Sequence, residues 1–182
     1  MNAVATDPQA VLAFWREAGF ERWFNGGEAF DAACRERFLE AHHAAARREL
    51  DHWLESADGA LALLILLDQI PRNVFRGSGH AFATDPLALH HARKVVDAGL
   101  DREVEPALRA FIYLPFEHSE DIADQHRSVA LFDALGNEGY ARYAQAHLEV
   151  IERFGRFPHR TRSLGRIDTA EERAWLEAGG GF

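Results

Sequence analysis

The sequence contains very little cysteine, methionine and lysine. Its 182 residues include one cysteine and one methionine, and of its 20 basic residues only Lys94 is not an arginine. A lone cysteine excludes an internal disulfide. Cys34 shares an apolar helical stripe with Phe30, Phe38 and Ala41, which predicts a buried, unreactive thiol. A single cysteine suits a reducing compartment, and the first residues lack the basic and apolar regions of a secretory signal, so we expect a cytoplasmic location.

Long apolar runs are absent as well. The longest, Ala60 to Leu67, is much shorter than the ~20 residues that cross a bilayer, so it predicts a buried core segment and no membrane partner. The formal net charge of −9 argues against broad binding to phosphate backbones, so no nucleic-acid partner is expected. The share of hydrophobic residues, 47%, is ordinary for a globular chain of one domain.

The alternation of apolar and polar residues that marks β-strands is missing. Helix start and stop signals take its place, including Asp7-Pro8, Thr84-Asp85-Pro86 and the capping box Thr169-x-x-Glu172. Together with the apolar spacing, they predict helices over residues 8–19, 28–50, 60–70, 85–99, 104–114, 120–135, 138–154 and 170–179. Pro71 and Pro115 are expected to end two of these helices. We therefore predict an all-α fold, a single domain over residues 1–182 with seven or eight helices packed as helical hairpins, and a frayed tail at 178–182.

Several motifs that carry known chemistry are absent, among them the Walker lysine, the Gly-x-Ser-x-Gly elbow and His-Glu-x-x-His. Two Glu-x-x-His pairs occur, Glu40/His43 and Glu49/His52. On one continuous helix these two pairs would face opposite sides, so they do not predict a di-metal site. The sequence therefore predicts no metal and no cofactor.

Positive charge is concentrated in one stretch. Residues 153–166 hold five arginines and His159 with no acidic residue, while the rest of the chain carries 15 basic and 29 acidic residues. Residues 153–166 therefore carry a formal charge of +5, whereas the rest of the chain carries −14. Guanidinium groups bind carboxylates and phosphates through paired hydrogen bonds. Two interpretations stay open: the arginines pair with the protein's own acidic residues, or Arg153, Arg156 and Arg160 bind an anionic ligand.

A second polar group follows the apolar run. Asp68, Gln69, Arg72 and Asn73 stand at the predicted C-terminal end of the central helix. Because the helix dipole disfavours a carboxylate there, we expect an arginine such as Arg72 or Arg153 to compensate Asp68. A structural ion pair and a ligand-binding group are both consistent with this pattern.

A third group surrounds His118. Ser119 is the predicted N-cap of the helix over 120–135, and Glu120 and Asp121 suit its first turn. Capping does not account for His118, which lies where helix N–H groups favour an anion. His118 and His159 are candidates for a general acid or base, with Glu120 or Asp121 as the orienting carboxylate.

His147 lies on the apolar stripe of the helix predicted over 138–154 and is expected to face inward. A core histidine with satisfied hydrogen bonds is one interpretation. Because this helix leads directly into the stretch 153–166, a pocket-lining role is the other.

Long strings around these groups resemble one known family. The mostly bacterial family called domain of unknown function 924 has signatures similar to Leu66-Leu-Asp-Gln-Ile-Pro-Arg-Asn-Val-Phe-Arg76, Tyr113-Leu-Pro-Phe-Glu-His-Ser-Glu-Asp121 and Arg153-Phe-Gly-Arg-Phe-Pro-His-Arg160. The stretch Arg16-Glu-Ala-Gly19 departs from the family, where a further aromatic residue is expected. The resemblance implies an all-helical, tetratricopeptide-like fold, and no established activity, cofactor or catalytic residue.

Three functional hypotheses follow, and each rests on the expectation that residues 68–73, 118–121 and 153–160 converge in space. The first is a site, enzymatic or not, at which the arginines of these segments hold an anionic small molecule. The second is an interaction module that captures an acidic peptide or a terminal carboxylate. The third is a buried ion network with a purely structural role.

Overall fold

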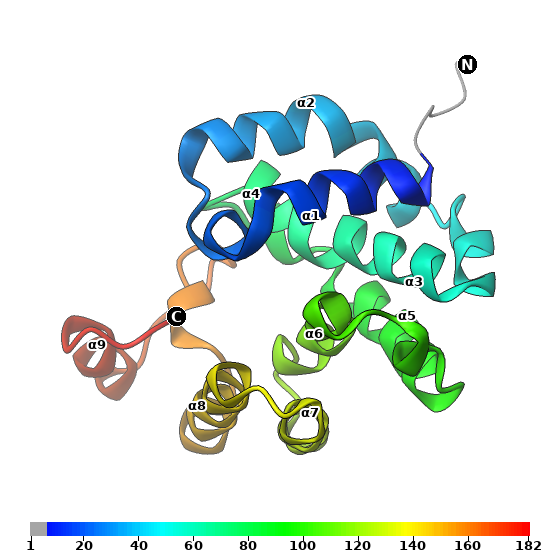
Figure 1. Cartoon of the computed structure of the whole chain (residues 1–182). Helices are drawn as coiled ribbons and strands as arrows, with labels where there is room; N and C mark the ends of the chain where they lie inside the picture. The colour runs from blue at the N-terminus through cyan, green and yellow to red at the C-terminus, as the bar shows by residue number, and fades with distance from the viewer. Residues whose placement is uncertain (1–6) are drawn as a thin grey trace. The chain divides into compact units, whose positions relative to one another are not determined.

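The structure, a computed structural model, describes residues 7–182. The chain divides into two compact units, the first formed by the residues up to 76 and 80–115, the second by 77–79 and 116–182. All regular elements in the described part of the chain are helical, which confirms the all-α prediction (Figure 1). If the helical run 57–74 is counted once, there are eight α-helical stretches between residues 7 and 182, within the predicted range. A single domain stays a prediction.

The first helix of the first unit, α1 (Pro8–Asn25), begins as its sequence predicts. The side chain of Asp7 caps it by accepting the N–H of Ala10 at 2.8 Å. The predicted end at Gly19 is only partly right, because Gly19 takes a left-handed φ of 68° at a kink and the chain then resumes a helix. Trp23 explains the continuation: its Nε1 donates to the backbone oxygen of Trp15 at 2.7 Å, which folds the second half back onto the first.

The apolar run forms the core of this unit, as predicted. Its helix, α3 (Ala57–Leu64), is capped by Ser56, whose Oγ accepts the N–H of Gly59 at 3.1 Å. Every residue from Ala60 to Leu67 is fully buried. In Figure 1, α1 lies between α3 and α2 (Gly27–Ala46), and it contacts both of them.

The prediction that Pro71 ends the central helix is wrong. A π-helical turn, η2 (Ile65–Gln69), follows α3 and leads into α4 (Ile70–Val74), with Pro71 at the start of α4. Within this wider turn the N–H of Ile70 donates to the oxygen of Ile65, five residues back. The shift of the hydrogen-bond ladder allows a residue without an N–H to follow at the start of a new helical segment.

Short helical turns link the other elements of the first unit. The helix predicted over 28–50 ends at Ala46, before the 3₁₀ turn η1 (Asp51–Glu55). After the 3₁₀ turn η3 (Gly79–Phe82), α5 (Asp85–Asp97) is followed by the left-handed Gly99 and the 3₁₀ turn η4 (Leu100–Glu103). The predicted end of the next helix at Pro115 is wrong, since α6 (Pro106–Glu117) continues through it.

The second unit is built on a helical hairpin. In it, α7 (Ile122–Leu135) packs against α8 (Glu138–Phe154). Gly136 takes a left-handed φ of 75° between them, and Asn137 caps α8 by accepting the N–H groups of Gly139 and Tyr140. The chain continues through the 3₁₀ turn η5 (Pro158–Arg160) to α9 (Ala170–Glu177), whose predicted capping box is present.

The tail after α9, expected to fray, makes ordered contacts instead. The N–H of Gly180 donates to the backbone oxygen of Trp175 at 2.9 Å. The ring of Phe182 stacks on the ring of His147, with centroids 3.6 Å apart. A sequence of three glycines indicates a loose segment, but it does not reveal that the next residue has an aromatic partner.

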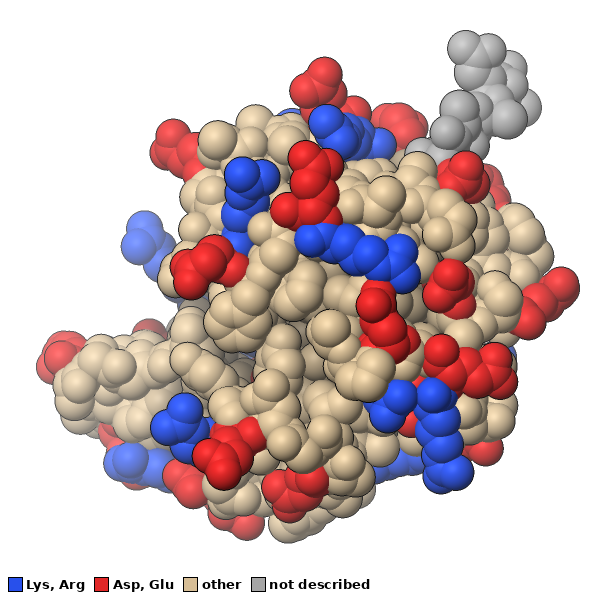
Figure 2. Space-filling view, in the orientation of Figure 1, with Lys and Arg blue, Asp and Glu red and all other residues tan. Residues whose placement is uncertain are grey.

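The surface mixes charges of both signs. Figure 2 shows acidic and basic side chains interspersed over the face in view. Ion pairs such as Arg16–Glu105 and Arg48–Asp51 occur at the surface of the protein. No helix between residues 7 and 182 is long and apolar enough to span a bilayer.

Candidate functional site

The polar group that follows the apolar run is held together within the first unit. Arg72 donates to both carboxylate oxygens of Asp85, at 2.8 and 2.9 Å, and to the backbone oxygen of Asp68 at 2.6 Å. Its Nη1 lies 3.3 Å from Oδ1 of Asp68, which confirms that Arg72 compensates this carboxylate. Gln69 donates to Asp68 at 2.6 Å, and Asn73 donates to the oxygen of Gln69 at 3.0 Å.

The other predicted site residues belong to the second unit, where the arginine segment (residues 153–166) follows α8. Arg156 forms a two-pronged ion pair with Glu172, at 2.6 and 2.7 Å. Glu172 is 1% exposed and belongs to the capping box of α9. Arg153 pairs with Glu171 at 2.9 Å, where both side chains are more than half exposed. Two of the five arginines therefore fasten α9 to the end of α8.

A third arginine fastens the segment to residue 120. Arg166 donates two hydrogen bonds of 2.8 Å to the carboxylate of Glu120, which also accepts the backbone N–H of Phe157 at 2.9 Å. Burial opposes ionisation of this carboxyl, but the hydrogen bonds from Arg166 and Phe157 outweigh it and lower the pKa of Glu120. Glu120 is therefore an ionised anchor of the loop.

The remaining two arginines of the segment differ in burial. Arg160 is 6% exposed; its Nη1 donates to the backbone oxygen of His118 at 2.9 Å, and its guanidinium lies 4.4 Å from the centre of the Phe157 ring. Arg162 is exposed and makes no ion pair with the described residues. Arg160 is thus the arginine that the fold draws inward beside a predicted histidine.

His118, His147, His159 and Arg160 form what we call the histidine–arginine cluster. The rings of His147 and His159 each lie 5.5 Å from the ring of Phe157, which is fully buried. The ring of His118 lies 6.5 Å from that of His147. The predicted convergence of residues 118 and 153–160 is therefore present within the second unit, whereas residues 68–73 belong to the first unit.

His147 faces inward, as predicted from its helical stripe, and is 6% exposed. Its Nδ1 lies 2.8 Å from the backbone oxygen of Tyr143 and 3.6 Å from Oε1 of Glu117. Because a carbonyl can only accept, Nδ1 carries the hydrogen and Nε2 is left as an acceptor. Burial lowers the pKa of His147 to about 3, the hydrogen bond to Tyr143 opposes this, and the other three members of the cluster lower it further by their charge.

The two carboxylates proposed to orient a histidine have other partners. Glu120 binds Arg166, and Asp121 is the N-cap of α7, where its Oδ1 accepts the N–H of Ala123 at 2.8 Å. The prediction that Ser119 is the cap is wrong, because α7 begins at Ile122 and its N-cap is Asp121; the Oγ of Ser119 accepts the N–H of Asp121 at 3.2 Å, ahead of the helix, and donates to Asp124 at 2.8 Å. A carboxylate at this position also gains from the positive end of the helix dipole, which a serine does not.

Metal ligands do not gather in the described residues. Between residues 7 and 182 no group of three or more histidine, cysteine, aspartate or glutamate side chains has a geometry that could hold a metal ion. Cys34 is buried, and burial raises the pKa of its thiol to about 12, in keeping with the unreactive thiol expected from the sequence.

Comparison with known proteins identifies the family of this chain. A family model described as "Bacterial protein of unknown function (DUF924)" matches residues 11–180. The chain belongs to this family. A solved structure of a protein of unknown function from Agrobacterium tumefaciens is similar to it, with a TM-score of 0.91 and 50% sequence identity over 94% of this chain and 97% of that chain. No match was found among curated proteins.

Sequence reasoning missed several residues of these networks in the DUF924 chain. Asp85, Glu171 and Glu172 are the acidic partners of predicted arginines, and Phe182 covers His147. Asp85 is 13 residues from Arg72, and Glu172 is 16 from Arg156, so no helical spacing signals either pair. The unbalanced charge of residues 153–166 was the only available signal that acidic partners lie elsewhere in the chain.

Proposed function

We propose that this DUF924 protein binds a small organic anion at the histidine–arginine cluster. The observation that carries the proposal is that His147, His159 and Arg160 lie against the buried ring of Phe157, with His118 beside His147. Caps and surface ion pairs account for the neighbouring acids and arginines, but neither requires three histidines and a buried guanidinium at one place.

Electrostatics support an anion rather than a cation. Glu117 places a carboxylate oxygen 3.6 Å from Nδ1 of His147, and the positive potential comes from Arg160, whose guanidinium is always charged and lies against the buried ring of Phe157. In a partly dry environment such a potential favours a negatively charged group more strongly than it would in water. Arg153, Arg156 and Arg166 contribute little to the potential, because each is paired with a carboxylate of the protein. The anion site proposed from the sequence is therefore narrowed to Arg160 and the histidines.

The tautomer of His147 indicates the class of anion. With Nδ1–H directed at the oxygen of Tyr143, the neutral ring presents Nε2 as an acceptor. An acceptor in the same cluster as the guanidinium of Arg160 suits an anion that also carries a hydroxyl group, such as a hydroxy acid. Because the pKa of His147 is about 3, this ring does not act as a base near neutral pH, so a catalytic step would fall to His118 or His159.

A peptide ligand is the second candidate, and the tail provides its specific support. Residues 179–182 lead the ring of Phe182 onto His147 and within 5.6 Å of the ring of His159. The cluster thus already packs against an aromatic side chain at the end of a short segment of backbone. An acidic peptide captured by a tetratricopeptide-like fold would use the same groups, and a cytoplasmic location suits either ligand.

Calorimetry with matched variants tests the proposal. Malate, lactate and phosphoglycerate are titrated into the full chain, into His159→Gln and into Arg162→Gln. We expect at least one of these anions to bind, His159→Gln to weaken that binding about tenfold, and Arg162→Gln to leave it unchanged, since Arg162 is exposed outside the cluster. Equal binding to all three proteins, or binding of none of the anions, would refute the proposal.

An acidic peptide ending in phenylalanine, titrated in parallel, separates the two candidates. Binding of the peptide alone, weakened by His159→Gln, would favour the interaction module over the small-molecule site.

A further inference from the structure

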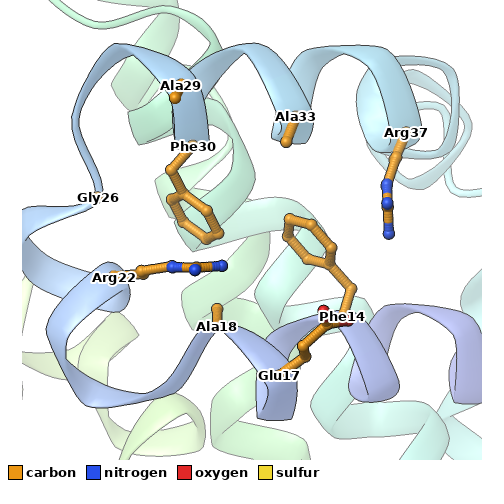
Figure 3. A pocket seen from close by; sticks show the side chains of 9 residues that line it. All are labelled: Phe14, Glu17, Ala18, Arg22, Gly26, Ala29, Phe30, Ala33 and Arg37. Atoms are coloured by element: carbon orange, nitrogen blue, oxygen red, sulfur yellow. The ribbon is translucent and has the colours of Figure 1, made fainter.

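A pocket of about 340 Å³ opens between α1 and α2 in the first unit. None of the residues that line it belongs to the histidine–arginine cluster. This volume falls at the lower end of the range for small-molecule sites, about 300–1,000 Å³. Figure 3 shows its lining, which combines two phenylalanines and several small residues with three charged side chains, Glu17, Arg22 and Arg37.

Two aromatic rings form the apolar part of the pocket. Phe14 and Phe30 lie nearly parallel, at 4° with centroids 5.4 Å apart, and Phe30 is 5% exposed. Alanines at positions 18, 29 and 33 face the same space, where larger side chains would fill it. Such a lining suits a flat or short hydrocarbon body.

Two arginines supply the charge. In Figure 3, Arg22 on α1 and Arg37 on α2 reach the pocket from opposite sides of the two aromatic rings. Neither guanidinium forms an ion pair or hydrogen bond with the described residues, and Arg37 only lies over the ring of Phe14 at 5.2 Å. This differs from Arg16 and Arg76, exposed arginines of the same unit that each have a carboxylate partner at 2.7 Å.

The formal charges of the pocket lining indicate the charge of a matching ligand. Arg22 and Arg37 contribute two positive charges and Glu17 one negative charge, so the lining carries one net positive charge. A monoanion neutralises this charge, whereas a phosphate dianion would leave an excess of negative charge beside the carboxylate of Glu17. We propose that the α1–α2 pocket binds a small monocarboxylate with an apolar, ring-sized body, its body beside Phe14 and Phe30 and its carboxylate bound by the arginine at one end of the pocket, Arg22 or Arg37.

Phenylpropionate is the probe for this pocket, and its uncharged amide and inorganic phosphate are the comparisons. Binding to the full chain is followed by amide NMR and calorimetry. We expect phenylpropionate to shift resonances of α1 and α2 and to bind at least tenfold more tightly than the amide, with no saturable shift from phosphate. Equal binding of acid and amide would overturn the role of the arginines, and a response to phosphate that matches the acid would overturn the role of the apolar body.

Variants keep the test independent of folding defects. Arg22→Gln and Arg37→Gln alter exposed side chains without ion pairs, so both proteins should fold, and the variant of the arginine that binds the carboxylate should weaken phenylpropionate binding about tenfold. Arg142→Gln, at an exposed position of α8, is the matched control and should bind normally. Unchanged binding in both pocket variants would refute the proposal. His159→Gln should not affect this pocket, so failure here is distinguishable from failure at the cluster.

Discussion

The buried histidine of the cluster should make the protein's stability depend on pH in a way that one substitution removes. An unfolded histidine binds a proton below its ordinary pKa of 6.5, whereas folded His147, with a pKa of about 3, does not. Between these two values the unfolded state therefore holds one more proton than the folded state, so the free energy of unfolding falls as the pH falls. At about 1.36 kcal/mol per pH unit, His147 accounts for a loss of about 2 kcal/mol between pH 6.5 and pH 5.

His147→Phe isolates this contribution, because phenylalanine keeps an aromatic ring against Phe157 and Phe182 and has no proton to bind. Urea unfolding followed by circular dichroism at several pH values compares the variant with the original chain. The variant should lose about 2 kcal/mol less over this interval. His126→Phe, at an exposed position of α7, is the control and should keep the original slope. Identical slopes for His147→Phe and the original chain would refute a buried neutral His147.

Three further predictions concern other contacts. Arg166→Gln, which loses two hydrogen bonds of 2.8 Å, should lower the melting temperature by about 2–4 °C, whereas the exposed Arg162→Gln should not change it. The folded pKa of Glu172 is about 2, against 4.5 for an ordinary glutamate, so its stabilisation is complete above pH 4.5 and is lost as the pH falls toward 2. The melting-temperature gap between the original chain and Glu172→Gln should therefore close over that range. Gly26→Ala would place its Cβ 2.7 Å from the oxygen of Arg22 and against the ring of Phe30, and should cost about 1–3 kcal/mol in urea unfolding.

Features set by neighbouring residues were predictable from the sequence. The cap Asp7 and the capping box at Thr169 act over three residues, and each is present in the structure. Pro71 and Pro115 were misread because proline was treated as a helix terminator. A π turn before Pro71 changes which N–H groups the helix needs, and this depends on the packing of a fully buried run rather than on local sequence.

The sequence allowed us to predict several residues of the candidate site, but not which carboxylate pairs with each arginine. The inward direction of His147 follows from helical periodicity, and its burial confirms it. The partners of the arginines do not follow from any periodicity, since Glu120 and Arg166 are 46 residues apart. A charge imbalance shows that partners or ligands must exist, and only the folded chain tells which arginines have been neutralised. Arg156 and Arg166 form ion pairs with Glu172 and Glu120, while Arg160 lies among the histidines.

Histidine-selective NMR directly tests whether an organic anion binds at the histidine–arginine cluster. With the ring nitrogens labelled, malate, lactate and phosphoglycerate are titrated at neutral pH while the signals of His118, His147, His159 and the exposed His126 are followed. We expect one anion to shift the three cluster signals together, with Nε2 of His147 changing as an acceptor does, and to leave His126 unchanged. Cluster signals that stay fixed, or that move no more than His126, would contradict this proposal.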